Sequence, residues 1–337
     1  MASKQRIAYW DNLKLVLIYL VVVGHFLIPI INKTGTVNAT FQWIYFFHMP
    51  AFVFVSGFFS KSFVKKEDQR INRLAGYILL YFIYFFALYF IEIAVLNAGT
   101  TLTLFSTKSA PWYMLAMALW LIFIPYFKDL NPYASIIITI VFGLLIGTDT
   151  ATCNAPTIAR IVILLPFFVA GYFFNGEHIK NIKIWMRILA VIILIAIFLL
   201  IFFNTQEINK YMAFFYCERS YLSMGKGNLK GIELRLLFYL ISSIMTVCVM
   251  CLIPTKKNIF TVIGERSLSV FVIHRLLRAF FIKYKFYDNI GGGKKALLIV
   301  LFVSLLISAF SSIKIFNEGF KKIIGIKIIK DNTKKQL

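Results

Sequence analysis

The chain has 337 residues, of which 60% are hydrophobic and 17% aromatic, and its mean hydropathy is +0.80. Soluble domains are usually about 45–50% apolar, so this composition excludes an ordinary soluble enzyme and indicates a polytopic membrane protein. The formal net charge of +22 would also suit a nucleic-acid-binding protein. Most of the basic residues, however, lie in short connections and in the C-terminal tail, as the positive-inside rule predicts. We therefore expect no nucleic-acid partner.

Ten apolar segments of about 20 residues follow one another along the chain. They cover residues 9–31, 41–60, 74–97, 111–127, 133–147, 158–174, 184–203, 231–253, 262–282 and 296–316. The first segment is too long for a cleaved signal peptide and has no small-residue cleavage site, so we expect it to remain as a span. The predicted fold is an all-α, polytopic integral membrane protein with about ten transmembrane helices in a single domain, residues 1–337.

Lys and Arg are unevenly divided between the connections on the two sides. The set of alternate connections that includes both termini carries about twice as many of them as the other set, which predicts that both termini are cytoplasmic. Residues 317–337 would then be a basic cytoplasmic tail, and residues 204–230 a long outer loop. A connection that long is either a lid over a binding site or a partly ordered interfacial segment.

The four cysteines are too few for a disulfide scaffold. Cys248 and Cys251 form a C-x-x-C in an apolar segment, which favours small core residues over metal or redox chemistry. Cys153 and Cys217 both fall in connections expected on the outside, so a disulfide between them is an open alternative. We expect no metal, because no H-x-x-x-H pattern or cysteine cluster supplies the three or four ligands that zinc requires.

Ionisable side chains inside membrane spans are costly, so each is a candidate site residue. His25 and Glu92 each lie six residues before the expected outer end of their span, about 9 Å deep, and His48 reaches a similar depth on the span that returns. Arg160 opens the sixth span on the same side. We predict that these four residues converge in the outer leaflet. For each histidine alone, the alternative is a ring that packs between helices and bonds a backbone carbonyl.

This set of residues suits acyl transfer. A neutral imidazole can take a proton from an acceptor hydroxyl or carry the acyl group briefly. An adjacent carboxylate would orient it, and an Arg or a second His would stabilise the oxyanion. The predicted catalytic residues are His25, His48 and Glu92. Arg160, with Trp112 and Tyr113 at the start of the fourth span, is assigned to substrate binding.

A second group of charged residues lies at the cytoplasmic ends of the spans. Arg70 and Arg73 are at i and i+3 and share a helix face, so their guanidinium groups suit a phosphate-bearing ligand. The alternative is a positive-inside anchor. Asp11 and Lys14, at the start of the first span, would organise the helix entry or touch the nucleotide part of the donor.

Several motifs in order resemble the integral-membrane acyltransferase family 3, in particular its branch similar to fucose 4-O-acetylases. R-x(4)-D-N-L-K at 6–14 followed by His25 matches the N-terminal motif of that family. FFHMPAFVFVSGFF at 46–59 is similar to the FHMP-to-SG signature of the branch, and R-x-x-R at 70–73 resembles the cytoplasmic motif of the family. The later blocks PWYMLAMALW at 111–120, ARIVILLPFFVAGYFF at 159–174 and IGERSLSVFVIH at 263–274 are also similar.

The resemblance implies transfer of an acyl group, usually acetyl, from acetyl-CoA or another acyl-CoA in the cytoplasm. The acceptor would be a sugar hydroxyl on a cell-envelope or extracellular polysaccharide or on its lipid-linked precursor. His25 would be the essential histidine, and Arg70 and Arg73 would hold the phosphates of the donor. Many members carry an acid where this chain has Pro50, and Glu92 is the expected replacement.

The implied location is the bacterial cytoplasmic membrane, with multiple passes. The implied partners are acyl-CoA, a glycan or lipid-linked sugar acceptor, and membrane lipid, and assembly as a homodimer stays open. Two other functions remain as alternatives. A transporter or flippase for a lipid-linked glycan would use intramembrane His and Arg along a translocation path, and a glycan polymerase would also be polytopic with a long outer loop. His274, Arg275 and Arg278 of the ninth span either line a cavity or tie helices together.

Overall fold

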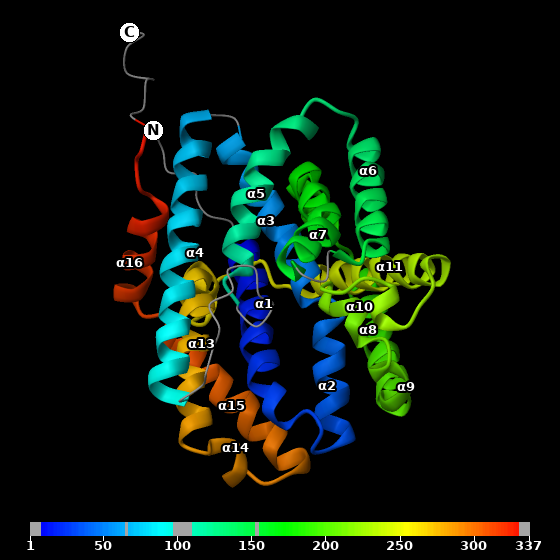
Figure 1. Ribbon diagram of the computed structural model, residues 1–337, viewed down its shortest axis with the longest axis vertical. Coiled ribbons are helices and arrows are strands. Elements are labelled where there is room, and N and C mark those ends of the chain that lie inside the picture. Colours follow the sequence, from blue (N-terminus) through cyan, green and yellow to red (C-terminus); the bar gives the residue numbers. More distant parts are fainter. Residues whose placement is uncertain (1–7, 65–66, 97–109, 152–154, 330–337) are drawn as a thin grey trace. The chain divides into compact units, whose positions relative to one another are not determined.

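The computed structural model describes residues 8–64, 67–96, 110–151 and 155–329. In these ranges every regular element is helical and there is no strand (Figure 1). Seven stretches of the described chain are long and apolar enough to cross a membrane, and two shorter apolar helices, Trp112–Phe127 and Pro132–Thr148, accompany them. The seven are Ala8–Ile30, Gly35–Val64, Glu67–Leu96, Pro156–Phe173, Ile184–Phe203, Asn228–Leu252 and Gly293–Ser311. The prediction of an all-α, polytopic membrane protein is confirmed, whereas the sidedness of the termini stays a prediction.

The chain forms two compact units. Unit 1 comprises Met1–Phe52, Asn175–Lys210 and Ile241–Asn317, and unit 2 comprises Val53–Phe174, Tyr211–Leu240 and Glu318–Leu337. Each unit therefore combines segments that are far apart in the sequence.

Helix α1 (Ala8–Leu27) is the centre of unit 1. Its main contacts are with α2 (Gly35–Tyr45), α12 (Thr261–Glu265), α13 (Ser267–Lys283) and α15 (Gly293–Ser311). Helix α2 also packs against α8 (Ile184–Phe203). Figure 1 shows α1 in dark blue beside the orange α15. Most residues of α1 are buried, including its polar first turns, because neighbours from the C-terminal third of the chain surround it.

The D-N-L-K motif fixes the start of α1 within unit 1. The Asn12 amide donates to two backbone carbonyls in the 254–256 segment, each at 2.8 Å, and its oxygen accepts from the Thr261 hydroxyl at 2.7 Å. A Cβ on Gly264 would lie 1.8 Å from the Asp11 carbonyl oxygen, so only glycine permits this approach of α12 to α1. The motif therefore has a structural part in addition to any role in binding.

The second predicted span consists of two helices, because Pro50 interrupts the backbone hydrogen bonds. Helix α2 ends at Tyr45, and α3 (His48–Val64) begins three residues later. Pro50 has no N–H to donate to the carbonyl of Phe46, four residues earlier. The Ser242 hydroxyl donates to that carbonyl instead, at 2.6 Å.

The ninth predicted span, residues 262–282, is also divided. Helix α12 ends at Glu265 and α13 begins at Ser267. Between them, the Arg266 guanidinium donates to the Ser312 carbonyl at 2.8 Å, just beyond the end of α15. The break is thus tied to the end of a neighbouring helix.

Unit 2 is built around α4 (Glu67–Leu96), α5 (Trp112–Phe127), α6 (Pro132–Leu145) and α7 (Pro156–Phe173). Helix α5 contacts α4 and α7, and α6 contacts α7. The part of α3 in unit 2 approaches α7 through two glycines. A Cβ on Gly57 would lie 1.9 Å from the Phe168 carbonyl oxygen, and a Cβ on Gly171 would lie 1.9 Å from that of Phe54. The backbones of α3 and α7 are therefore in direct contact, as is typical where small residues meet in membrane proteins.

The predicted basic tail is partly helical and docks on α4. Helix α16 (Lys314–Ile324) ends against Gly76, whose added Cβ would lie 2.4 Å from the Ile324 carbonyl oxygen. The Asn72 side chain accepts from the backbone N–H groups of Ile328 and Ile329, at 2.8 and 2.9 Å, and donates to the Ile329 carbonyl at 3.0 Å. The tail is therefore attached to unit 2 at least as far as residue 329.

Candidate active site

Three histidines of unit 1 form the candidate site, and we call them the histidine cluster: His25 of α1, His48 of α3 and His274 of α13. The rings of His25 and His274 have centroids 5.2 Å apart and planes inclined by 40°. The Tyr45 ring centroid lies 4.7 Å from that of His48, and an atom of the same Tyr45 ring lies 3.0 Å from a Cβ built on Gly24, the residue before His25. The structure places His25, His48 and His274 in one unit, and the catalytic roles of His25 and His48 stay a prediction.

His25 differs from its two neighbours in its hydrogen bonds. His48 Nδ1 lies 2.8 Å from the Ile44 carbonyl oxygen, and His274 Nδ1 lies 2.8 Å from that of Val270. Each of these rings therefore donates to the carbonyl four residues earlier, and in its neutral form it keeps the lone pair on Nε2. His25 Nδ1 is buried and has no hydrogen-bond partner among the described residues, although the residue itself is partly exposed. His274 Nε2 also has no partner among the described residues, but His274 is fully buried and His48 is 4% exposed, so His25 is the member of the cluster most open to a ligand.

Basic and phenolic groups lie beside the cluster. Arg278 follows His274 by one helical turn, and within the described chain its buried Nε has no hydrogen-bond partner. The Tyr287 hydroxyl of α14 (Phe286–Asn289) lies close to that guanidinium, and burial raises the pKa of Tyr287 to about 12. Tyr287 therefore keeps its proton at neutral pH. Lys33 Nζ donates to the Tyr287 carbonyl at 2.6 Å and so ties α14 to the end of the first span. Arg278 and Tyr287 are donors suited to a developing negative charge.

Arg160 and Trp112, both assigned to the substrate, lie together in unit 2. The Arg160 guanidinium lies 5.4 Å from the Trp112 ring centroid, forms an ion pair with the Glu218 carboxylate, and donates through Nε to the Tyr216 carbonyl at 3.0 Å. Arg160 thereby attaches residues 216–218, in the unit 2 part of the predicted outer loop, to α7. Glu92, the predicted third catalytic residue, is a partly exposed residue of α4 in the same unit.

Tyr113, the third residue assigned to the substrate, follows Trp112 in α5 and is buried in unit 2. Its hydroxyl is hydrogen-bonded to the Ser56 hydroxyl of α3. Ser56 and Gly57 form the Ser-Gly pair of the second-span motif, so this motif holds α3 against α5 through Tyr113 as well as against α7.

A second arginine of this region, Arg235, did not stand out in the sequence. It is fully buried in α11 (Asn228–Leu252), and its Nη1 donates to the Phe214 carbonyl at 2.5 Å. Its guanidinium lies 5.4 Å from the ring centroid of Phe214 and 5.3 Å from that of Phe238. The signal that could have found it is an arginine inside the predicted span 231–253, since charges within spans are costly.

The 204–230 segment is ordered by these contacts. It contains α9 (Thr205–Asn209), α10 (Met212–Tyr216) and the short helix η5 (Leu222–Met224). We expect Arg160→Leu to weaken the attachment of residues 211–224 by about 1–3 kcal/mol, because it leaves the Glu218 carboxylate, which is 19% exposed, without its partner. The measurement is the rate of cleavage of this segment by chymotrypsin in detergent, which should rise.

Lys230→Ala is the matched control for this prediction. Both side chains of the Lys230–Glu233 ion pair are exposed, and exposed ion pairs contribute little to stability. An unchanged cleavage rate in Arg160→Leu would contradict the anchoring role of Arg160.

The two arginines assigned to the donor lie in the first two turns of α4. Arg70 Nη2 lies 3.4 Å from the Glu67 carboxylate, which is itself 75% exposed. The Arg73 guanidinium lies 4.7 Å from the centroid of the Phe63 ring. Neither arginine is held by a buried carboxylate among the described residues, so both retain donors for an anionic ligand.

The other two residues assigned to the donor belong to unit 1. Lys14 Nζ lies 2.8 Å from the Asp11 carboxylate, and the Asp11 side chain is fully buried. The opposite charges of Asp11 and Lys14 neutralise each other, and the pair lies in the turn of α1 that Gly264 of α12 contacts. Asp11 and Lys14 therefore take part in the packing of α1 against α12. Their contact with the acyl donor stays a prediction.

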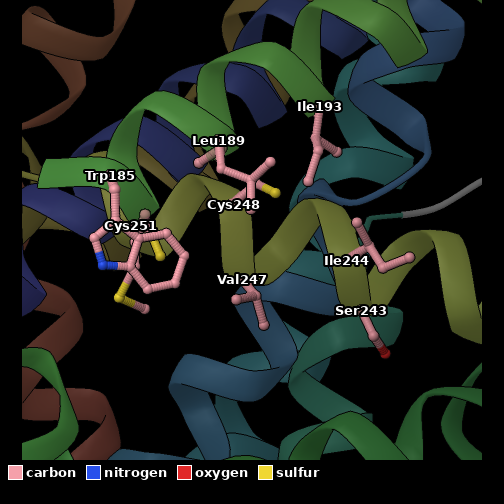
Figure 2. A pocket seen from close by; sticks show the side chains of 10 residues that line it. Trp185, Leu189, Ile193, Ser243, Ile244, Val247, Cys248 and Cys251 are labelled. Carbon is pink, nitrogen blue, oxygen red and sulfur yellow. The ribbon is translucent and has the colours of Figure 1, made fainter. Parts of the chain in front are cut away.

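An apolar groove of about 420 Å³ lies between α8 and α11 in unit 1. Figure 2 shows Trp185, Leu189 and Ile193 on one side and Val247 and Cys248 on the other. Cys248 and Cys251 are buried free thiols in the groove wall. The groove can receive a hydrocarbon chain, but it offers no acid, base or nucleophile activated by a neighbouring charge.

The sequence matches the family profile described as an acyltransferase domain over residues 7–315, which is nearly the whole chain. No curated protein and no solved structure matches it. The matched range contains the histidine cluster, the two arginines of α4 and the arginine of α7. The resemblance to the family is therefore confirmed at family level.

Proposed function

Because the chain belongs to acyltransferase family 3 and is a membrane acyltransferase, we propose that it is an O-acetyltransferase of the branch similar to fucose 4-O-acetylases. Its donor is acetyl-CoA or a related acyl-CoA. Its acceptor is a sugar hydroxyl on a cell-envelope or extracellular polysaccharide, or on the lipid-linked precursor. The FHMP-to-SG motif at 46–59 supports the narrower branch, and the lysine-rich and arginine-rich connections support the bacterial cytoplasmic membrane as its location.

The observation that carries the proposal is the difference between His25 and the other two members of the histidine cluster. His48 and His274 are each anchored to a backbone carbonyl, whereas His25 Nδ1 is not. A general base must have a nitrogen within hydrogen-bond reach of the proton that it removes. His25 meets this requirement best, because it is partly exposed, whereas His48 is 4% and His274 0% exposed.

In the proposed step, His25 removes the proton from the acceptor hydroxyl while the hydroxyl oxygen attacks the carbonyl carbon of the thioester. A C–O bond forms, the C–S bond breaks, and the imidazolium returns its proton to the departing thiolate of coenzyme A. Arg278 and Tyr287 donate to the carbonyl oxygen as its negative charge develops. In the alternative order, the acyl group first resides on His25 and then passes to the hydroxyl. Rapid quenching with radiolabelled acetyl-CoA in the absence of acceptor separates the two orders, because only the second labels the protein.

The donor is proposed to place its phosphates on Arg70 and Arg73, with Asp11 and Lys14 at the entry to the first span. We expect Arg70→Ala to raise the KM for acetyl-CoA about tenfold and to leave the KM for the acceptor nearly unchanged, because it removes a charge-assisted hydrogen bond. Initial-rate measurements with each substrate varied in turn provide the test.

Lys128→Ala serves as the control for this prediction, since Lys128 is 48% exposed and its ion pair with the exposed Asp129, at 3.9 Å, contributes little. If Arg70→Ala kept the wild-type KM for acetyl-CoA, the assignment of the donor site would be wrong.

The direct test of the proposed function uses membranes that contain the protein and radiolabelled acetyl-CoA. We expect label to appear in envelope glycan, together with release of coenzyme A. Movement of a lipid-linked glycan across the membrane without consumption of acetyl-CoA would instead support a flippase, and lengthening of the glycan chain would support a polymerase.

A further inference from the structure

A polar pocket of about 230 Å³ lies at the end of the first span in unit 1. Its polar lining consists of Asn32, Thr34, Asn38, Gln206 and Asn209. These residues come from the connection between α1 and α2, from the start of α2, and from α9. No lining residue of this pocket carries a charge. We call it the amide pocket, because four of the five polar side chains are carboxamides.

Two buried carboxamides of α2 are not satisfied by the protein. Asn38 is 6% exposed and Gln42 is fully buried, yet Asn38 Oδ1 and Gln42 Oε1 have no hydrogen-bond partner in the part of the chain that the structure describes. The Gln42 amide nitrogen donates to the Thr205 carbonyl at 3.0 Å, which fixes the orientation of that side chain. Buried polar groups nearly always have a partner, and an unmade bond is destabilising. Of these two residues Asn38 lines the amide pocket, so its oxygen points to a ligand there that donates a hydrogen bond.

Neutral hydroxyl groups are the donors that this lining fits. A carboxamide offers both an acceptor and two donors, so a set of them can pair with hydroxyls in either sense. An anionic ligand would find no cation in the lining, and an apolar ligand would leave the carboxamides unpaired. We propose that the amide pocket binds a neutral sugar residue of the acceptor glycan, an inference that rests on the proposed acyl transfer to a sugar hydroxyl.

The position of the amide pocket agrees with this role. Ile31, which also lines it, follows His25 by six residues, or roughly 9 Å along a helix. Asn38, Gln42 and Tyr45 lie at i, i+4 and i+7 and form one stripe of α2. The centroids of the Tyr45 and His48 rings are 4.7 Å apart. A Cβ on Gly24, the residue before His25, would lie 3.0 Å from an atom of the Tyr45 ring. The stripe thus runs from the amide pocket to the histidine cluster, so a glycan held in the pocket extends toward His25.

The test measures binding of soluble tetrasaccharides to the purified protein in lipid nanodiscs by saturation-transfer difference NMR. The probes are chitotetraose and maltotetraose, which are neutral, and tetragalacturonate, which is anionic. We expect at least one neutral probe to receive saturation, and Asn38→Leu and Asn209→Ala to weaken its binding about tenfold, since each removes hydrogen bonds to hydroxyls. Equal binding by wild type and both variants, or binding of tetragalacturonate alone, would overturn the proposal.

Thermal unfolding separates a ligand-binding role of Asn38 from a structural one. Because the buried Asn38 Oδ1 has no partner to lose, Asn38→Leu should unfold at the wild-type temperature or above it, and a lower temperature would indicate a structural role. Asn209 is exposed, so Asn209→Ala remains informative if Asn38→Leu does not fold. Asn204→Ala is the matched control, since its amide donates to the Leu200 carbonyl and does not line the amide pocket; it should bind the probes as wild type does.

A variant of the catalytic histidine distinguishes failure of this inference from failure of the proposed function. His25→Gln should bind the neutral probe as wild type does. If wild type binds the probe but transfers no radiolabel from acetyl-CoA to glycan, the amide pocket stands and the proposed function fails. If wild type transfers label and Asn38→Leu and Asn209→Ala do so with an unchanged acceptor KM, the amide pocket fails and the proposed function stands.

Discussion

Replacement of His25 by Gln should abolish acyl transfer while the protein remains folded. Gln has nearly the size and polarity of His but cannot act as a base, and loss of a positioned general base lowers a rate by about 10²–10⁴-fold. The measurement is incorporation of radiolabel from acetyl-CoA into envelope glycan by membranes with equal amounts of wild-type and variant protein. Because His25 Nδ1 bonds nothing among the described residues, no native hydrogen bond of that atom is lost on substitution, and the thermal unfolding temperature should stay close to that of wild type.

His178→Gln is the matched control for this experiment. His178 is exposed in the short helix η4 (Gly176–Asn181), so its replacement should leave the rate of transfer unchanged. His274→Gln tests the anchored member of the cluster. It should lower the rate less than His25→Gln does, because His274 acts beside His25 and its Nδ1 is held by the Val270 carbonyl. Transfer by His25→Gln at the wild-type rate would exclude His25 as the base.

Length and hydropathy were sufficient to locate the long spans, because a helix that crosses lipid must satisfy its own backbone in one continuous apolar run. The predicted span 184–203 coincides with α8 (Ile184–Phe203), in which only Ala190, Leu194 and Ile201 are buried by the described chain. The predicted spans 41–60 and 262–282 are each divided into two helices. At the first break the Ser242 hydroxyl donates to the Phe46 carbonyl that Pro50 leaves without a helical donor, and at the second the Arg266 guanidinium donates to the Ser312 carbonyl. A proline inside a span is a visible signal, whereas the acceptor of Arg266 is not encoded locally.

Depth in the membrane fixes only one coordinate of each candidate site residue. The helical rise places His25, His48, Glu92 and Arg160 at similar levels, but it says nothing about their lateral positions. The structure places the two histidines in unit 1, and Glu92 and Arg160 in unit 2. The ring of His274 lies against that of His25, a contact across 249 positions of sequence that no local pattern reveals.

The close contact between the backbones of α3 and α7 should make unit 2 sensitive to any added side-chain atom. Gly57→Ala and Gly171→Ala should each destabilise unit 2 strongly, because the new Cβ would lie 1.9 Å from a backbone carbonyl oxygen of the facing helix. A carbonyl within a helix cannot rotate away as a flexible side chain can, so α3 and α7 must separate. Overpacking of this kind costs typically 1–3 kcal/mol and sometimes more. We expect the unfolding temperature to fall by roughly 5–10 °C.

The unfolding is measured in detergent with a thiol-reactive dye, since Cys217 is 2% exposed in the native unit 2 and becomes reactive when that unit opens. Gly319→Ala is the control, because apart from the adjoining residues and backbone of α16 itself no described atom lies within 4 Å of the added Cβ, and Ala has the higher helix propensity. It should unfold at the wild-type temperature or slightly above.

The double variant Gly57→Ala with Gly171→Ala should lose less stability than the sum of the two single losses, since helices separated by one added Cβ already make room for the other. Additive losses would mean that the two glycines act at independent contacts, and a wild-type unfolding temperature for either single variant would contradict the backbone contact between α3 and α7.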